Sequence, residues 1–79
     1  MRGRTITKIE RKKFVIVFDL PREFHSERKR VNLELKRINA KMIQFSVWES
    51  EKLKELMAIA LIIKRFGGVS KILEEKFLF

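Results

Sequence analysis

The chain has 79 residues, enough for one small domain over residues 1–79 and too few for two separate hydrophobic cores. Apolar residues make up 46% and charged residues 37% of the sequence, which excludes a disordered chain and favours a globular domain. Cysteine is absent, which excludes disulfide scaffolds, thiolate zinc sites and cysteine nucleophiles. A domain this small buries only about 60% of its unfolded surface, so a second subunit would stabilise it.

The positive charge is concentrated in the first half of the chain. The formal net charge is +9; residues 1–13 hold six basic residues against one acidic, and residues 22–41 hold seven against three. Neutralising phosphates releases counterions, so this distribution favours a nucleic-acid partner. The alternative is that the cations only solubilise a small domain. The cations that we expect to contact nucleic acid are Arg22, Arg28, Lys29, Arg30, Lys36, Arg37 and Lys41.

No segment has the character of a signal peptide or a membrane span. Residues 1–13 form a basic N-terminal segment that lacks the apolar stretch of a secretory signal. The longest uninterrupted apolar run, residues 57–63, is far too short to cross a bilayer. We therefore expect a soluble, cytoplasmic protein without a membrane partner.

The first half of the chain predicts a strand followed by a helix. Residues 14–18, Phe-Val-Ile-Val-Phe, are apolar at every position and indicate a central strand with helices on one face and another cover on the other. Pro21 ends this strand and suits the start of a helix. The helix lies between residues 23 and 38, where Val31, Leu35 and Ile38 form an apolar stripe, and Asn39 is expected to stop it.

The second half predicts a strand, a helix and a last strand. Residues 42–48 alternate, with Ile43, Phe45 and Val47 expected on the core face and Gln44, Ser46 and Trp48 on the other, and a short hairpin could follow at residues 48–52. Ser50 is expected to cap a helix that ends at Gly67 and Gly68. Its predicted apolar positions are Leu53, Leu56, Met57, Ala60 and Ile63.

The final strand is expected within residues 69–79, where aromatic residues alternate over residues 76–79. The resulting order predicts an α+β fold of the ferredoxin-like βαββαβ type, with two helices on one face of an antiparallel sheet.

Asp19 is the foremost candidate for chemistry. It leaves the predicted central strand just before a cationic helix, where a carboxylate could bind Mg²⁺ beside a phosphate. The alternative is that Asp19 caps the helix ahead of Pro21. Arg28 and Arg30 are two residues apart and do not share a helix face, so each would reach phosphate from a different side or lie exposed.

His25 and Trp48 carry weaker signals. His25 is the only histidine, and we interpret it as an exposed residue at the start of the helix rather than a base or metal ligand. Trp48 could stack on a base. A tryptophan that ends an alternating strand is more often part of a core or an interface.

Three motifs together resemble a known family. FVIVFDLP, ERKRV and MIQFSVWES, within residues 14–50 and in this order, resemble the CRISPR-associated protein 2 family, whose members are ferredoxin-like dimers. The resemblance implies a Mg²⁺-dependent endonuclease acting on RNA or DNA, and also a homodimer that the CRISPR spacer integrase holds during spacer capture. It further implies that Asp19 from each subunit binds Mg²⁺, with Arg28 and Arg30 as the helix arginines. The chain departs from the family pattern at Phe18, where tyrosine is common, and at Met42, where arginine often stands.

Three functions are open from the sequence. The first is a nuclease in which paired Asp19 carboxylates hold Mg²⁺ while Arg28 and Arg30 stabilise the developing negative charge. The second is a non-catalytic adaptor that binds duplex DNA and the integrase. The third is an unrelated single-strand RNA-binding domain, because FVIVFDLP also resembles the first-strand motif of RNA-recognition domains, whose aromatic residues stack on bases.

Overall fold

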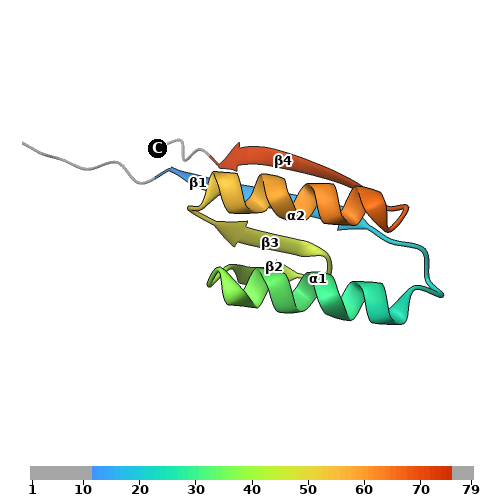
Figure 1. Ribbon diagram of the computed structural model, residues 1–79. Helices are drawn as coiled ribbons and strands as arrows, with labels where there is room; N and C mark the ends of the chain where they lie inside the picture. The colour runs from blue at the N-terminus through green and yellow to red at the C-terminus, as the bar shows by residue number, and fades with distance from the viewer. Residues whose placement is uncertain (1–11, 76–79) are drawn as a thin grey trace, which may run out of the picture.

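The chain folds as one antiparallel sheet with two helices, in the predicted order βαββαβ (Figure 1). The structure is a computed structural model that describes residues 12–75. Its elements are β1 (Lys13–Asp19), α1 (His25–Arg37), β2 (Lys41–Gln44), β3 (Val47–Ser50), α2 (Leu53–Arg65) and β4 (Val69–Glu75). The strand order β2-β3-β1-β4 places β1 at the centre of the sheet, which confirms the expected ferredoxin-like architecture.

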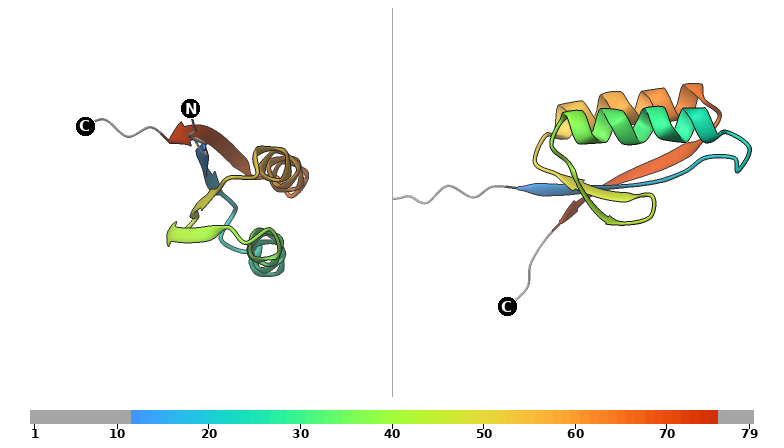
Figure 2. Two further views of the ribbon diagram at one scale, coloured as in Figure 1. Left: turned by 90° about the vertical axis from the view of Figure 1, so that its left-hand side faces the viewer. Right: turned by 90° about the horizontal axis from the view of Figure 1, so that it is seen from below.

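The molecule has two layers. Both helices cover the same face of the sheet, and no other element of residues 12–75 covers the opposite face (Figure 2). We call this opposite side the open face. Neither helix in this part of the chain is long and apolar enough to cross a membrane.

The core lies between the helices and the sheet. Ile16 and Phe18 of β1 alternate with more exposed neighbours and point toward the helices. The other buried apolar side chains come from both helices, from β3 and from the segment after β1: Leu20, Val31, Leu35, Trp48, Leu56, Ile59 and Ile63. Each fully buried side chain of this size contributes about 1.5–3 kcal/mol.

The predicted continuous strand over residues 42–48 is instead a tight hairpin. β2 ends at Gln44, Phe45 and Ser46 form the turn, and Ser46 has a positive φ of 65°. Trp48 lies opposite Ile16 in the register of β1 and β3, and paired residues share a face, so Trp48 is buried with 4% exposure. The expected core assignments of Ile43, Phe45 and Val47 were therefore wrong, while the alternative that Trp48 belongs to the core is confirmed.

The helix boundaries differ in smaller ways. Ser50 does not cap α2: its hydroxyl accepts a hydrogen bond from the backbone N–H of Lys52 at 3.0 Å, and the helix begins at Leu53 without a side-chain cap. Met57 is exposed, because the buried stripe of α2 runs through Leu56, Ile59 and Ile63.

The predicted helix ends are confirmed. Asn39 has a φ of 63° after α1, and Gly67 has a φ of 85° after α2. The last strand is β4, and the aromatic segment of residues 76–79 lies outside the described residues, as do residues 1–11 of the basic N-terminal segment.

Candidate nucleic-acid interface

Asp19 is the last residue of β1, and its side chain is exposed. It follows Val15 and Val17 in the alternation of the strand, so it lies on the open face at one end of the sheet. The structure contradicts the capping alternative. The N-cap position of α1 is Phe24, which makes no side-chain cap hydrogen bond, and Pro21 starts the preceding turn by accepting a hydrogen bond from the Phe24 N–H at 3.0 Å.

Arg28 is held by contacts within the fold. Its Nη1 donates to the hydroxyl of Ser46 at 2.9 Å, and its Nη2 donates to the carbonyl oxygen of Leu20 at 3.2 Å. These two bonds connect the start of α1 with the β2–β3 turn and with the segment that leaves β1. A backbone hydrogen bond also holds this turn against β1, since the N–H of Phe18 donates to the Ser46 carbonyl oxygen at 3.1 Å.

Arg30 points to a different side of α1, as its spacing from Arg28 predicts. Its Nε donates to Glu34 Oε2 at 3.3 Å, and Arg37 Nη1 lies 3.6 Å from the other carboxylate oxygen of Glu34. The two arginines share one carboxylate and remain exposed, so their joint charge stays positive. Arg28 and Arg30 therefore do not converge on one phosphate within a single subunit.

The remaining predicted cations surround α1. Arg22, Lys29, Lys36 and Lys41 all have exposed side chains. Lys29 and Lys36 are seven residues apart, which places them on nearly the same line of the helix and about 10 Å apart along its axis. Lys41 begins β2 and lies near the far end of α1.

Asp19 is the residue that the sequence predicts as a metal ligand. Residues 12–75 contain no group of three or more His, Cys, Asp or Glu side chains that could hold a metal. His25 is exposed at the first position of α1, in agreement with its interpretation. Mg²⁺ retains several waters and binds proteins through one or two carboxylates, so one exposed aspartate, or one from each of two subunits, fits this ion.

Phe45 is a candidate residue that the sequence pattern did not indicate. Its ring is 73% exposed, and its centroid lies 4.7 Å from the guanidinium carbon of Arg28. The alternation of residues 42–48 had assigned it to the core, and residues Phe45 and Ser46 lack the Asn-Gly signature that marks a two-residue turn. Trp48, for which stacking on a base was one of two alternatives, is buried in the core and is not available to a base.

The open face of the sheet carries an apolar patch at its centre, bordered by charged residues such as Asp19, Glu49 and Lys71. Val15 and Val17 of β1 are flanked by Val47 of β3 and by Val69 and Leu73 of β4. Val17 is 39% exposed, and Val69 and Leu73 are more so. Phe14 and Phe18 lie on the side of β1 that the helices cover. They are therefore not available to stack on bases, as the first-strand aromatic residues of an RNA-recognition domain would.

A cavity of about 240 Å³ lies at the other end of the sheet. It is lined by Lys13, Ile38, Asn39, Lys41, Glu49, Ser50, Glu51 and Lys52. Lys13 and Asp19 are the two ends of β1, six residues and about 20 Å apart. The cavity is thus distinct from the Asp19 end, and Lys41 is the only predicted site residue that lines it.

Near this cavity two carboxyl groups meet on the open face. The pKa of Glu75 is raised above its usual value, first by a hydrogen bond to the Glu49 carboxyl, then by burial and by repulsion from Glu49, while Lys13 opposes the shift. Glu75 Oε1 is buried and has no hydrogen-bond donor within residues 12–75. The folded chain therefore favours the protonated form of Glu75 more than the unfolded chain does.

Comparison with known protein families and with curated proteins finds no match to this chain. Ferredoxin-like folds carry many unrelated functions, so the function of this chain has to be argued from its own residues. Those residues are the cations of α1, the exposed Asp19 and the apolar open face.

Proposed function

We propose that this chain binds nucleic acid as a homodimer in the spacer-acquisition machinery of a CRISPR system, with the spacer integrase as its protein partner. The observation that carries the nucleic-acid part is the exposure of the cations on and beside α1. Lys29 and Lys36 form one line of the helix and the paired Arg30 and Arg37 form another. The acidic residues of the helix are Glu27 in its first turn and Glu34, which pairs with both arginines, so the cations outnumber them. A phosphodiester backbone is the polyanion that such a repeated cationic surface fits. The integrase partner comes from the family resemblance.

The open face supports the homodimer. A surface of Val15, Val17, Val47, Val69 and Leu73 is costly to expose to water, at about 25 cal/mol per Å² of apolar area. A second copy of the same face matches it in chemistry, and a twofold arrangement is the commonest solution for such contacts. Asp19 also lies on the open face. Each subunit of the dimer would therefore carry its Asp19 on the face that contacts the partner, at one end of the sheet.

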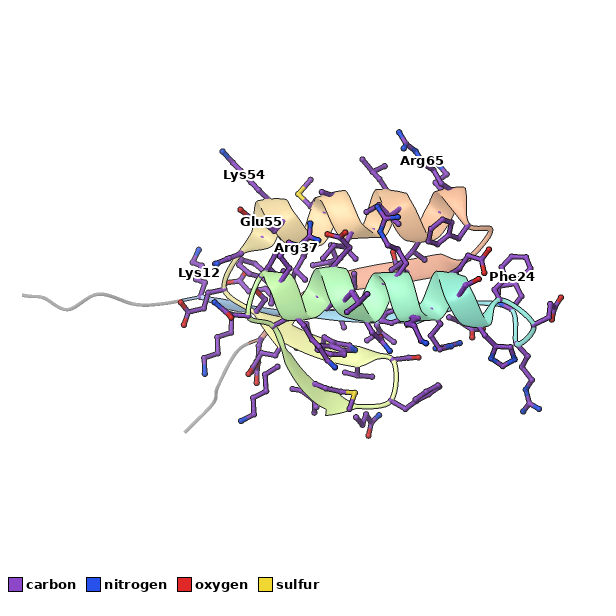
Figure 3. All side chains as sticks on the ribbon, turned by 60° about the horizontal axis from the view of Figure 1, so that its bottom comes forward. Lys12, Phe24, Arg37, Lys54, Glu55 and Arg65 are labelled. Atoms are coloured by element: carbon purple, nitrogen blue, oxygen red, sulfur yellow. The ribbon has the colours of Figure 1, made fainter. Side chains whose placement is uncertain are left out.

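The test of nucleic-acid binding is affinity for a labelled DNA duplex as a function of salt. Raising salt from about 50 mM to about 200 mM should weaken binding at least tenfold, because released counterions drive it. Lys29→Ala combined with Lys36→Ala should weaken binding at low salt and flatten this dependence. The matched control is Lys54→Ala combined with Lys64→Ala, which removes two exposed lysines from α2 (Lys54 is labelled in Figure 3). Equal affinities of the α1 double variant and the control would contradict the proposed surface.

A Mg²⁺-dependent endonuclease activity is the second candidate, and the exposed position of Asp19 favours it. Bound Mg²⁺ would supply the activation of water and the neutralisation of phosphate charge. Asp19 would provide its ligand from each subunit, and the surrounding cations would hold the strand. Arg28 would have a positioning role. Its hydrogen bonds to Ser46 and to Leu20 keep the β2–β3 turn against the end of β1.

A further inference from the structure

The β2–β3 turn presents an aromatic ring at the same end of the molecule as Asp19. The hydrogen bond from Phe18 to Ser46 joins the turn to β1 one residue before Asp19, and Phe45 precedes Ser46 in that turn. The ring of Phe45 is the most exposed large apolar side chain of the described residues. Such an exposed phenylalanine needs an explanation beyond packing.

The ring is already held in place. One face lies against the Arg28 guanidinium, at 4.7 Å from centroid to Cζ, and that guanidinium is fixed by its bonds to Ser46 and Leu20. A cation on one face of a ring holds it by electrostatic attraction and leaves the opposite face free. A ring ordered before binding loses less conformational entropy when a ligand stacks on it.

We propose that Phe45 is a stacking surface for an unpaired nucleobase, so that the nucleic acid held at the Asp19 end is single-stranded where it passes the β2–β3 turn. The proposal rests on the nucleic-acid binding proposed above and names the substrate class of that surface. Every base has an aromatic face, so this contact is tolerant of sequence and contributes about 1–3 kcal/mol per base. In a duplex the base faces are occupied by their neighbours, so only an unpaired or extruded base can use the ring.

The cations near the turn, which lie among the acidic Asp19, Glu23 and Glu27, favour a nucleic acid over an apolar protein segment. Arg22 and Lys29 are exposed near the start of α1, the end of the helix that Phe24 marks in Figure 3. Arg28 connects this end of the helix to the turn through its hydrogen bond to Ser46. A strand that stacks one base on Phe45 would thus find cations for its phosphates nearby. A purely apolar partner would have to desolvate these charges without pairing them.

The experiment compares three labelled oligonucleotides of equal length. They are a single strand of thymidines, a strand with the same backbone but abasic at every position, and a DNA duplex. The parent protein should bind the thymidine strand at least about fivefold more tightly than the abasic strand, as one stacked base predicts. Phe45→Leu should abolish this preference and leave the affinities for the abasic strand and the duplex unchanged.

Two further variants separate stacking from general effects. Phe45→Trp keeps a larger aromatic face and should retain or increase the preference for the thymidine strand. Leu33→Ala removes an exposed apolar side chain from among the α1 cations and should leave the preference intact. Thermal unfolding of each variant should stay close to that of the parent, because both positions are exposed and the Arg28–Phe45 contact contributes only about 0.5–1 kcal/mol.

The outcomes are distinguishable. If Phe45→Leu keeps the preference for the thymidine strand, the ring does not stack on a base, while the proposed nucleic-acid binding still holds. If Phe45→Leu changes only self-association, the ring is a subunit contact and the inference is overturned. If the parent binds none of the three oligonucleotides, both the inference and the proposed function fail.

Discussion

The backbone of Gly68 lies so close to Asp19 that a Cβ atom on Gly68 would stand 2.5 Å from the Asp19 carbonyl oxygen. The same atom would stand 2.7 Å from Leu20 Cδ2 and 2.9 Å from Ile63 Cγ2. Gly68 precedes β4, whose first residue Val69 lies opposite Asp19 in the sheet register. The connection from α2 to β4 therefore packs directly on the end of β1 and helps to position the candidate metal ligand.

Gly68→Ala should destabilise the protein more than Gly67→Ala. At Gly68 the added methyl group meets backbone, so we expect a loss of about 2–3 kcal/mol, in the range of overpacked sites. At Gly67 the added atom meets only Phe24 at an ordinary 3.8 Å, and the φ of 85° alone should cost about 1 kcal/mol. Urea unfolding of the two variants measures the difference, and equal losses would show that the connection can move away.

Arg28→Lys should lower stability, and Arg30→Lys should not. A lysine cannot donate to Ser46 and to Leu20 with the geometry of the guanidinium fork, so we expect a loss of about 1–2 kcal/mol. Arg30 makes one exposed pair with Glu34, and its replacement should change stability by less than about 0.5 kcal/mol. Urea unfolding at constant pH and salt measures both, and the reverse order would mean that Arg28 does not hold the turn.

Glu75→Gln should make the protein more stable than the parent at neutral and alkaline pH. The pKa of Glu75 is raised, chiefly by its hydrogen bond to Glu49, so the folded chain binds this proton more tightly than the unfolded chain. The stability that the folded chain gains from this tighter proton binding is present in acid, and it is lost as the pH rises through the raised pKa. Glutamine keeps a hydrogen-bond donor at every pH, so the advantage of the variant should shrink toward zero in acid.

The measurement is the urea midpoint across a pH series. The control is Glu74→Gln, whose parent carboxylate lies 3.9 Å from Lys12 Nζ in an exposed pair and should matter little. An advantage of Glu75→Gln that is the same at all pH values would mean that the carboxyl pair does not share a proton.

Val17→Glu should convert the proposed dimer to a monomer without unfolding the chain. Val17 lies on the open face opposite Lys71 of β4, so a glutamate there gains a cross-strand partner in the monomer but carries charge into the proposed contact. The mass in solution, from sedimentation at several concentrations, measures the effect. Met57→Glu, on the exposed side of α2, should remain dimeric. A monomeric parent would contradict the proposed homodimer.

Asp19→Asn should abolish the proposed Mg²⁺-dependent cleavage and leave the proposed nucleic-acid binding in place. The amide keeps the shape of the side chain but removes the charge that attracts Mg²⁺. The assay follows single-stranded RNA and duplex DNA with Mg²⁺ or with a chelator. Glu23→Gln, an exposed acid between β1 and α1, should cleave like the parent. Undiminished cleavage by Asp19→Asn would assign the activity to other groups.

The candidate site was only partly accessible to sequence reasoning. Asp19 could be located because a strand of five apolar residues ends next to it, and the spacing of Arg28 and Arg30 predicted their different directions. The contact of Arg28 with Phe45 could not be predicted, because it joins residues 17 positions apart through a turn that has no sequence signature.

The sequence by itself determined the order of the elements and most of the core, because periodicities of two and 3.6 residues are local and place Ile16, Val31 and Leu56 on buried faces. Only the tertiary structure decided which face Trp48 and Phe45 occupy. That choice depends on the register of β3 against β1, where Trp48 lies opposite Ile16, and a shift of one residue exchanges the two sides of a strand. Pairing between strands is a long-range contact that the local sequence does not specify. The two-residue period of a strand shows that its side chains alternate, but it does not show which face of the strand is buried.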